Sequence, residues 1–223
     1  MSLRILPDLV QGTDEWHDQR RGMVTASVVG RLLTATGRVA ENDYSRGLTD
    51  QLVAERITGW TEPTYINADM MRGIEDEPRA VAKYSERYAD VTTVGFMVRD
   101  DWTFSIGYSP DGLVGDDGLI EVKSRRPKKH LQTILSGEVP AENYAQLQCG
   151  LLVSGREFID YLSYCGGMPM WVKRVTPEPK WFEAIVAAVN AFEASAALMV
   201  EQYSAATVGL ATTERPIELE LVI

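Results

Sequence analysis

The chain has 223 residues, of which 45% are hydrophobic and 24% are charged, and its formal net charge is −10. These values suit one globular domain with a substantial core, and the negative total excludes a surface that is basic throughout. With no apolar run of about 18 residues and no signal-like start, we expect a cytoplasmic protein without a membrane segment. Cys149 and Cys165 form no CxxC pair, which argues against zinc or iron–sulfur sites and predicts two buried thiols.

The first part of the chain has the apolar spacing of helices. We expect helices over 25–34 and 44–58, the second ending at a glycine. A third helix is predicted within 69–88. Because proline is tolerated in the first turn of a helix, we place the regular part of this helix from about Glu77, just before Pro78.

The pattern then changes to β-branched and apolar stretches, which indicate strands over 91–98, 103–108, 119–123, 157–164 and 169–175. Between the second and third of these strands, Gly115-Asp116-Asp117-Gly118 predicts a hairpin turn. Helices are expected over 141–153 and 180–203, and alternation at Ile217, Leu219 and Leu221 suggests a short strand in the tail.

This order of elements predicts an α/β (α+β) fold. We expect a single domain over residues 1–223, with the C-terminal helix and tail, from about residue 180, as an appendage.

Two carboxylates and a lysine have the spacing of a site on a sheet. Ser109-Pro110-Asp111-Gly112 precedes Glu121-Val122-Lys123 along the chain. Strand side chains alternate between faces, so Glu121 and Lys123 point the same way, and the hairpin folds their strand back beside Asp111. Oxygen ligands of this kind suit Mg²⁺, which polarises a phosphoryl oxygen and lowers the pKa of a bound water. A nearby lysine can orient that water or offset charge at phosphorus.

These short motifs also have a purely structural interpretation, because Pro-Asp-Gly is a common turn and Glu-x-Lys a common solvated strand face. Further polar groups occur at Glu75-Asp76-Glu77, at Gln146, and at Trp16, Arg20 and Ser27 near the N-terminus. Acids at a helix start can serve the helix dipole alone. The residues by themselves therefore leave a nuclease site and a structural role both open.

The densest basic run follows the strand at 119–123 directly and contains Arg125, Arg126, Lys128 and Lys129. It can steer a DNA backbone into the site, or it can be a solvated loop. The sequence does not choose between these interpretations.

Five segments in this order resemble the lambda exonuclease family, or YqaJ-type viral recombinases, a branch of the PD-(D/E)xK nucleases. They are QGTDEWHDQRRGMVTAS, RGIEDEPRA, GYSPDGLV, LIEVKS and NYAQLQ. The resemblance covers roughly residues 10–175. It implies a central mixed sheet flanked by helices and a 5′-to-3′ exonuclease that digests one strand of linear duplex DNA to mononucleotides for phage-type recombination. It also implies a homotrimeric ring, a single-strand-annealing partner and two Mg²⁺ (or Mn²⁺) ions.

The resemblance also implies roles for individual residues. The metal ligands would be Glu77, Asp111, Glu121 and the Val122 carbonyl, with Lys123 as the catalytic lysine. Arg20, Ser27, Ser109 and Gln146 match positions around the 5′-phosphate, Gln146 also belongs with the catalytic group, and Trp16 matches an aromatic residue near the DNA. Glu75 and Asp76 are rivals to Glu77, and Gln148 is a rival to Gln146.

Two alternatives differ from this interpretation. A PD-(D/E)xK restriction or junction-resolving endonuclease would share Asp111, Glu121 and Lys123 but would not need a 5′-phosphate pocket. A non-catalytic DNA-end-binding scaffold would be expected to lack one of the carboxylates or the lysine, yet all are present. A Ser-His-Asp hydrolase is unsupported, because neither His17 nor His130 accompanies a serine in a nucleophile elbow.

Overall fold

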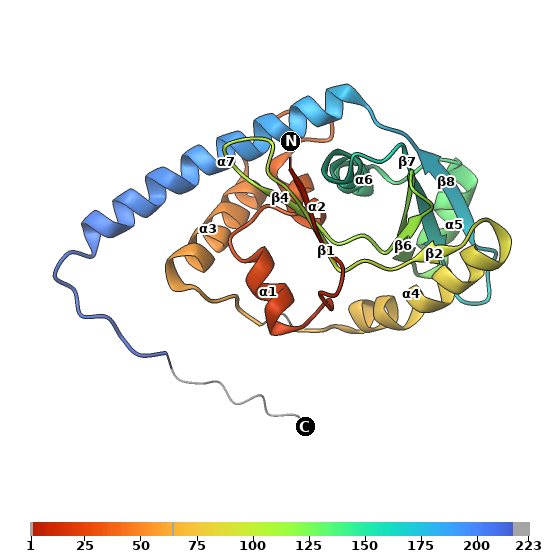
Figure 1. The fold of residues 1–223 in the computed structure, drawn as a ribbon, viewed down its shortest axis with the longest axis horizontal. Coiled ribbons are helices and arrows are strands. Elements are labelled where there is room, and N and C mark those ends of the chain that lie inside the picture. The colour runs from red at the N-terminus through yellow and green to blue at the C-terminus, as the bar shows by residue number, and fades with distance from the viewer. Residues whose placement is uncertain (1, 64, 216–223) are drawn as a thin grey trace.

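The computed structural model describes residues 2–63 and 65–215, and it contains two β-sheets surrounded by helices (Figure 1). The antiparallel three-stranded sheet has the order β1-β3-β4, with strands Leu3–Leu6, Phe96–Arg99 and Ile106–Tyr108. The larger sheet has the order β2-β5-β6-β7-β8, with strands Val91–Thr92, Gly112–Val114, Gly118–Ser124, Phe158–Tyr164 and Trp171–Val175. Strands β6 and β7 are parallel and the other neighbours are antiparallel, so this sheet is mixed.

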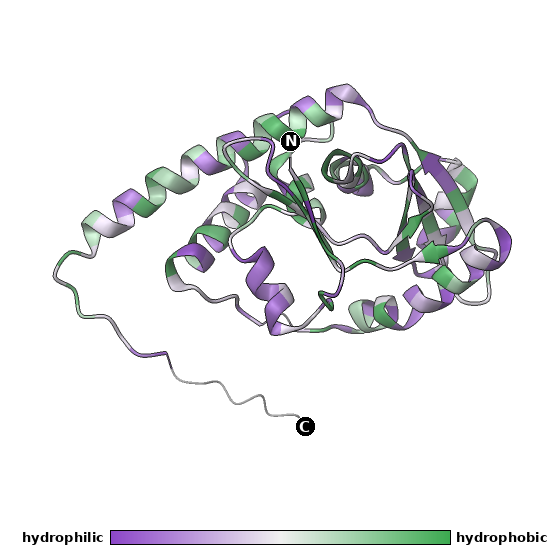
Figure 2. Cartoon of the chain, in the orientation of Figure 1, coloured by the Kyte–Doolittle hydropathy of each residue, from purple (hydrophilic) through white to green (hydrophobic). Residues whose placement is uncertain are grey.

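The α-helices are α1 (Asp14–Arg20), α2 (Ala26–Val29), α3 (Asp43–Thr58), α4 (Ala68–Arg87), α5 (Pro127–Ser136), α6 (Ala141–Ser154) and α7 (Pro179–Ala206). A short 3₁₀ helix, η1 (Gly30–Leu32), continues α2. Figure 2 shows apolar residues gathered on the central α6 and polar residues along α1. The predicted α/β architecture is confirmed, with two sheets in place of one.

The larger sheet is covered on both faces, and its two faces carry different groups. Ile120 and Val122 of β6 pack with Ala80 and Tyr84 of α4 in one apolar cluster. Leu119, which alternates with them, belongs to the other cluster, to which α6 contributes. Because strand side chains alternate, Glu121 and Lys123 share the face of Leu119 and point toward α6.

Helix α4 begins earlier than predicted. It runs without a break from Ala68 to Arg87, with Asn67 as its N-cap, and Pro78 lies inside it. The expected start near Glu77 is therefore wrong. A proline inside a helix costs about 3 kcal/mol. The Asn67 side chain, which accepts hydrogen bonds from two backbone N–H groups, and the burial of Ala80 and Tyr84 offset that cost here.

The predicted strand over 91–98 is divided between the two sheets. Its first residues form β2 in the larger sheet, and Phe96–Arg99 forms β3 in the smaller one. The chain crosses over at Gly95, where an added Cβ would lie 2.1 Å from the carbonyl oxygen of Leu9. A side chain would not fit at this close backbone approach, so glycine is required where the chain passes from one sheet to the other.

Several other elements differ in length from the prediction. The helix expected over 25–34 is α2 followed by η1, and the strand expected over 103–108 is only Ile106–Tyr108. Lys128 and Lys129 of the basic run lie in α5, with Pro127 in its first turn, whereas Arg125 and Arg126 precede the helix. The helices ending at Gly59 and Gly155 are confirmed, and both glycines have left-handed backbone conformations.

Helix α7 packs against α3 and α6. Its side chains Ile185, Val189 and Phe192 are buried. Among the described helices, α7 is the one whose length and hydropathy would also suit a membrane span, and 28% of its apolar window is buried inside the protein. The expected strand at Ile217, Leu219 and Leu221 lies outside the described residues.

Candidate active site

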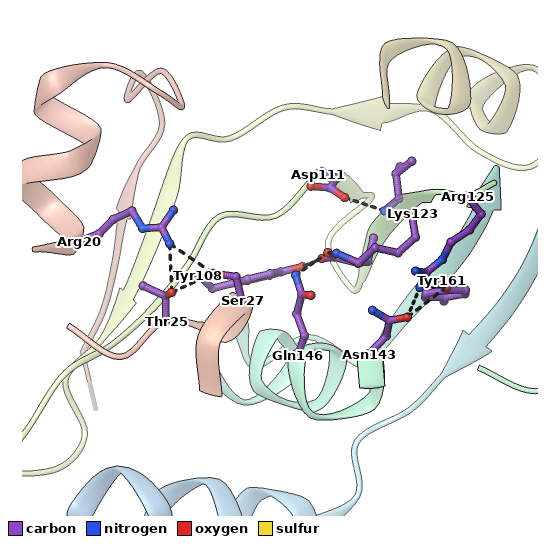
Figure 3. Close-up of polar contacts among 12 residues, drawn as sticks. Arg20, Thr25, Ser27, Tyr108, Asp111, Lys123, Arg125, Asn143, Gln146 and Tyr161 are labelled. Atoms are coloured by element: carbon purple, nitrogen blue, oxygen red, sulfur yellow. Dashed lines mark hydrogen bonds and ion pairs between the residues drawn. The ribbon is translucent and has the colours of Figure 1, made fainter. Parts of the chain in front are cut away.

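Asp111 lies directly before strand β5, and its side chain accepts a hydrogen bond from the part of β6 that β5 leaves unpaired. The pairing of β5 with β6 stops at Gly112 opposite Ile120. Beyond that point, the N–H of Val122 donates to Asp111 Oδ2 at 2.6 Å. The carboxylate takes the place of a strand residue, and the hairpin brings Asp111 beside the strand that carries Glu121 and Lys123, as predicted (Figure 3).

Glu121 is the most heavily hydrogen-bonded carboxylate of the site and is only 2% exposed. Its Oε1 accepts from Lys123 Nζ at 2.7 Å and from Gln146 Nε2 at 2.5 Å. The hydroxyl of the buried Tyr108 donates to its Oε2 at 3.4 Å. Glu121 is thus the point at which side chains of strand β6 and helix α6 are hydrogen-bonded to each other's element.

Of the three neighbouring acids on α4, only Glu77 lines the same cavity. Glu75 is exposed, and the buried Asp76 accepts from Ser124 Oγ at 2.7 Å on the opposite face of β6. Gln148 is likewise directed elsewhere, because its side chain donates to the Thr176 carbonyl and accepts from the Glu178 N–H. These positions favour Glu77 and Gln146 over their rivals.

The site has more negative than positive charge. Burial, together with the charges of Glu121 and Glu77, raises the pKa of Asp111 well above its ordinary value. Burial and Glu121 also raise the pKa of Glu77. Burial opposes the charged form of Lys123, yet Glu121 and Asp111 raise the pKa of its ammonium above its ordinary value. One lysine therefore balances three carboxylates, and a divalent cation would relieve the remaining repulsion.

The chemistry of the donor atoms fits a hard divalent cation such as Mg²⁺. Among the described residues, no three His, Cys, Asp or Glu side chains are grouped tightly enough to hold a metal ion as they stand. Lys123 and Gln146 instead occupy Glu121 Oε1. In a strand, the N–H and C=O of one residue point to the same edge, so the Val122 carbonyl faces the same side as Asp111. The residues present can supply carboxylate and carbonyl oxygens after a side-chain rearrangement.

A second polar group lies in the same cavity and contains a half-buried cation, Arg20. Arg20 donates through one nitrogen to Thr25 Oγ1 at 3.2 Å and to Ser27 Oγ at 3.3 Å, and these two hydroxyls are 3.1 Å apart (Figure 3). Its guanidinium carbon lies 3.9 Å from the ring centroid of Trp16. Burial lowers the pKa of Arg20 to about 10, and the charge of Glu55 opposes this shift.

Trp16 connects this basic group to the segment before β5, because its Nε1 donates to Ser109 Oγ at 3.0 Å. Both groups line one cavity of about 230 Å³. Its lining consists of Gln11, Trp16, Arg20, Thr25, Ser27, Glu77, Phe96, Tyr108, Ser109, Asp111, Glu121, Val122, Lys123 and Gln146. All the residues predicted for the metal, the lysine and the phosphate pocket are in this set.

Comparison with known proteins identifies the family. The model of the YqaJ-like viral recombinase domain matches residues 15–157, which is more than half of the chain. The chain belongs to the YqaJ-like viral recombinase family. Searching the curated proteins gave no match.

The solved structures agree with this family. An alkaline exonuclease (LHK-Exo) from Laribacter hongkongensis is 35% identical, with a TM-score of 0.78 over 89% of this chain and 100% of that one. The same enzyme in complex with dAMP is 34% identical, with a TM-score of 0.79 and the same coverage. A phage-related exonuclease from Haemophilus somnus 129PT is 12% identical over 81% of this chain and 96% of that one, and its TM-score of 0.63 shows a shared fold. The predicted PD-(D/E)xK exonuclease-type core is confirmed.

In this YqaJ-like chain, most of the basic run is paired within the protein. Arg126 Nε lies 2.9 Å from Asp69, and Lys129 Nζ lies 2.7 Å from Glu142. Arg125 donates to Asn143 and Tyr161. Lys128 is exposed, and the described part of the chain gives it no ion-pair partner.

Four residues of the cavity were not among the predicted site residues: Gln11, Thr25, Phe96 and Tyr108. Thr25 and Tyr108 are buried, and each contacts a predicted residue, Arg20 and Glu121 respectively. The signal was present, since Thr25 lies two residues before Ser27 and Tyr108 directly precedes Ser109 within the quoted motifs.

Proposed function

We propose that this YqaJ-like recombinase is a metal-dependent 5′-to-3′ exonuclease that digests one strand of linear duplex DNA to mononucleotides and leaves 3′ overhangs. The main support is the single cavity in which a carboxylate–lysine cluster and a half-buried arginine with two hydroxyls lie together. An endonuclease needs the first group only. A cation placed beside the cleavage centre suits an enzyme that holds a terminal phosphate while it cuts the next bond.

The metal ligands in this proposal are Asp111, Glu121, Glu77 and the Val122 carbonyl, and the ion would be Mg²⁺ or Mn²⁺, as a pair. When bound, the ions would polarise the scissile phosphodiester and lower the pKa of the attacking water. Support comes from the acid-rich composition of the cavity and from the raised pKa of the Asp111 and Glu77 carboxyls.

Lys123 and Gln146 would act on the reacting groups themselves. Both side chains donate to Glu121 Oε1 in this structure. Once that oxygen serves the cation, both donors are free to turn toward the phosphate or the attacking water. The ammonium of Lys123 would offset the charge that develops at phosphorus, and the Gln146 amide would orient the water by hydrogen bonding.

Arg20, Ser27, Ser109 and Gln146 would hold the 5′-phosphate. A guanidinium presents a planar set of donors that suits a phosphate. The hydrogen-bond partners of Arg20 in the described residues are neutral hydroxyls, so its half-buried charge would gain a strong partner when an anion binds. Trp16 stacks on Arg20 and would lie beside the terminal nucleotide. The complex of the Laribacter enzyme with dAMP, a mononucleotide, is consistent with such a product.

Family membership supports four further parts of the proposal: binding to double-stranded DNA ends, a homotrimeric ring, a single-strand-annealing partner and action in the cytoplasm. Sedimentation of the purified protein with and without a linear duplex tests the ring. A trimer mass is expected, and a monomer that digests DNA at full rate would contradict it.

Strand polarity tests the proposed function. A linear duplex carries a fluorescent label near the 5′ end or near the 3′ end of the same strand, and it is digested in Mg²⁺. We expect labelled mononucleotide to appear at once from the 5′ label and only after a delay from the 3′ label. A closed circular duplex serves as the control and should stay intact. Early release of the 3′ label, or cutting of the circle, would contradict a 5′ exonuclease.

A further inference from the structure

Three charged residues alternate along β6 and just beyond it. Glu121 and Lys123 point toward α6, and Arg125 continues the alternation past Ser124. The backbone N–H of Arg125 still donates to the Tyr164 carbonyl at 2.8 Å, so the ladder between β6 and β7 extends to this residue. Glu121, Lys123 and Arg125 therefore form one stripe on the face that α6 covers.

Helix α6 contacts this stripe at both ends. Gln146 donates to Glu121, and Asn143, three residues earlier, accepts from the guanidinium of Arg125. Residues three apart lie on one side of a helix, so the two contacts act together. Figure 3 shows Gln146 and Asn143 projecting from the same side of α6, toward the strand that carries Lys123.

The contact at Arg125 is part of a network of three side chains. One Arg125 nitrogen donates to Asn143 Oδ1 and, at 3.0 Å, to the hydroxyl of Tyr161. That hydroxyl in turn lies 3.3 Å from Asn143 Oδ1. Tyr161 is fully buried and pairs with Glu121 in the parallel register of β6 and β7. The network thus links the strand of Glu121, its neighbour β7 and the helix of Gln146.

We propose that Arg125 is a positioning residue that holds α6 in register with β6, through Asn143 and Tyr161, so that the Gln146 amide reaches Glu121. This inference rests on the proposed function of Gln146 and Glu121. It assigns Arg125 a role within the protein in place of the DNA contact expected from the basic run. The Nε of Arg125 is also buried and has no hydrogen-bond partner in the described residues, which places the guanidinium against the protein interior.

The planar donor set makes arginine suited to this role. One terminal nitrogen serves two acceptors that come from different elements. A lysine keeps the charge but lacks the planar fork, so it should not replace the arginine. Without the guanidinium, Asn143 and Tyr161 lose their shared donor in a buried environment, and α6 loses one of its two fixed points on the strand.

The experiment measures single-turnover digestion of a linear duplex by a saturating excess of protein. The variants are Arg125→Ala, Arg125→Lys, Asn143→Ala and the Arg125→Ala/Asn143→Ala double variant. DNA affinity is measured at several salt concentrations without Mg²⁺. Arg46→Ala is the matched control, since Arg46 is an exposed arginine whose ion-pair partner within the described residues is Asp43 alone. We expect each of the four site variants to lower the rate constant at least about tenfold, with Kd and its salt slope unchanged. The double variant should lose no more than either single variant.

Three results would overturn the proposal. A normal rate constant in Arg125→Lys, with a weaker Kd and a shallower salt slope in Arg125→Ala, would make the residue a DNA contact. Additive losses in the double variant would separate Arg125 from Asn143. A lower amplitude with an unchanged rate constant would mean that the contact only maintains folding. If Arg125→Ala does not fold, Asn143→Ala and Arg125→Lys carry the test. The polarity assay on the unaltered protein decides the proposed function independently.

Discussion

Asp111→Asn should make the metal-free protein more stable while it abolishes nuclease activity. The raised pKa of Asp111 means that its charged form destabilises the fold, by about 1.4 kcal/mol for each pKa unit. Asparagine has nearly the same shape and keeps an oxygen that can accept the Val122 N–H. The substitution therefore removes one of three repelling charges without leaving a buried donor unsatisfied. We expect a gain of at least about 1 kcal/mol, or about 2–4 °C in Tm for a chain of this size.

Asp111→Ala provides the matched comparison. It removes the same charge but leaves the Val122 N–H without its acceptor, which costs about 1–3 kcal/mol. Thermal melting near pH 8 with EDTA, then with Mg²⁺, measures all three proteins. Asparagine should melt above alanine, and Mg²⁺ should stabilise the wild-type protein more than either variant.

The stability gained by Asp111→Asn should depend on pH, because folding raises the pKa of the Asp111 carboxyl. A carboxyl whose pKa is raised by folding costs no stability below its unfolded value near 4, where both states are protonated. As the pH rises from there toward the folded pKa, the unfolded state ionises while the folded state keeps the carboxyl protonated, so stability is lost increasingly. The advantage of asparagine should therefore be absent at low pH and should grow with pH. A metal-free Asp111→Asn protein that melts below the wild type at pH 8, or that digests DNA, would refute this reasoning.

Two further predictions concern basic residues: Lys123 in the cavity, and Arg126 and Lys128 in the basic run. Lys123→Ala should lower kcat at least about tenfold and leave the Kd for DNA nearly unchanged, because its ammonium acts mainly in the transition state; single-turnover rates and binding titrations measure the two effects. Neutralising Arg126 and Lys128 together should weaken DNA binding and reduce the slope of log Kd against log salt by up to about 2; an unchanged slope would show that neither side chain approaches a phosphate.

The sequence carried enough information to place the core of the site. Period-two alternation puts Glu121 and Lys123 on one face, and the Asp-Gly turn brings Asp111 back beside them, because both rules depend only on neighbouring residues. Contacts between segments that are distant in the sequence could not be predicted from local patterns. Trp16 reaches Ser109, and Arg20 lies in the same cavity as Glu121. Only the order of family motifs suggested that these segments meet.

The misplaced elements have physical reasons that local patterns do not contain. Pro78 marks a helix start by propensity, yet tertiary packing of Ala80 and Tyr84 and the cap at Asn67 extend α4 beyond it. Gly95 separates two strands because of the Leu9 backbone, which is far away in sequence. The charges of the basic run gave no sign that Arg125 would turn inward, since its partners Asn143 and Tyr161 come from other elements.

The most direct test of the central claim compares 5′-phosphorylated and 5′-hydroxyl linear duplexes in Mg²⁺, with wild-type protein and with Arg20→Ala. Hydrogen bonds to charged groups are worth roughly 1.5–3 kcal/mol. We therefore expect the wild type to digest phosphorylated ends about tenfold faster or more, and Arg20→Ala to lose most of that preference by slowing on phosphorylated ends. Equal wild-type rates on both ends would contradict a 5′-phosphate pocket at Arg20 and, with it, the proposed 5′ exonuclease.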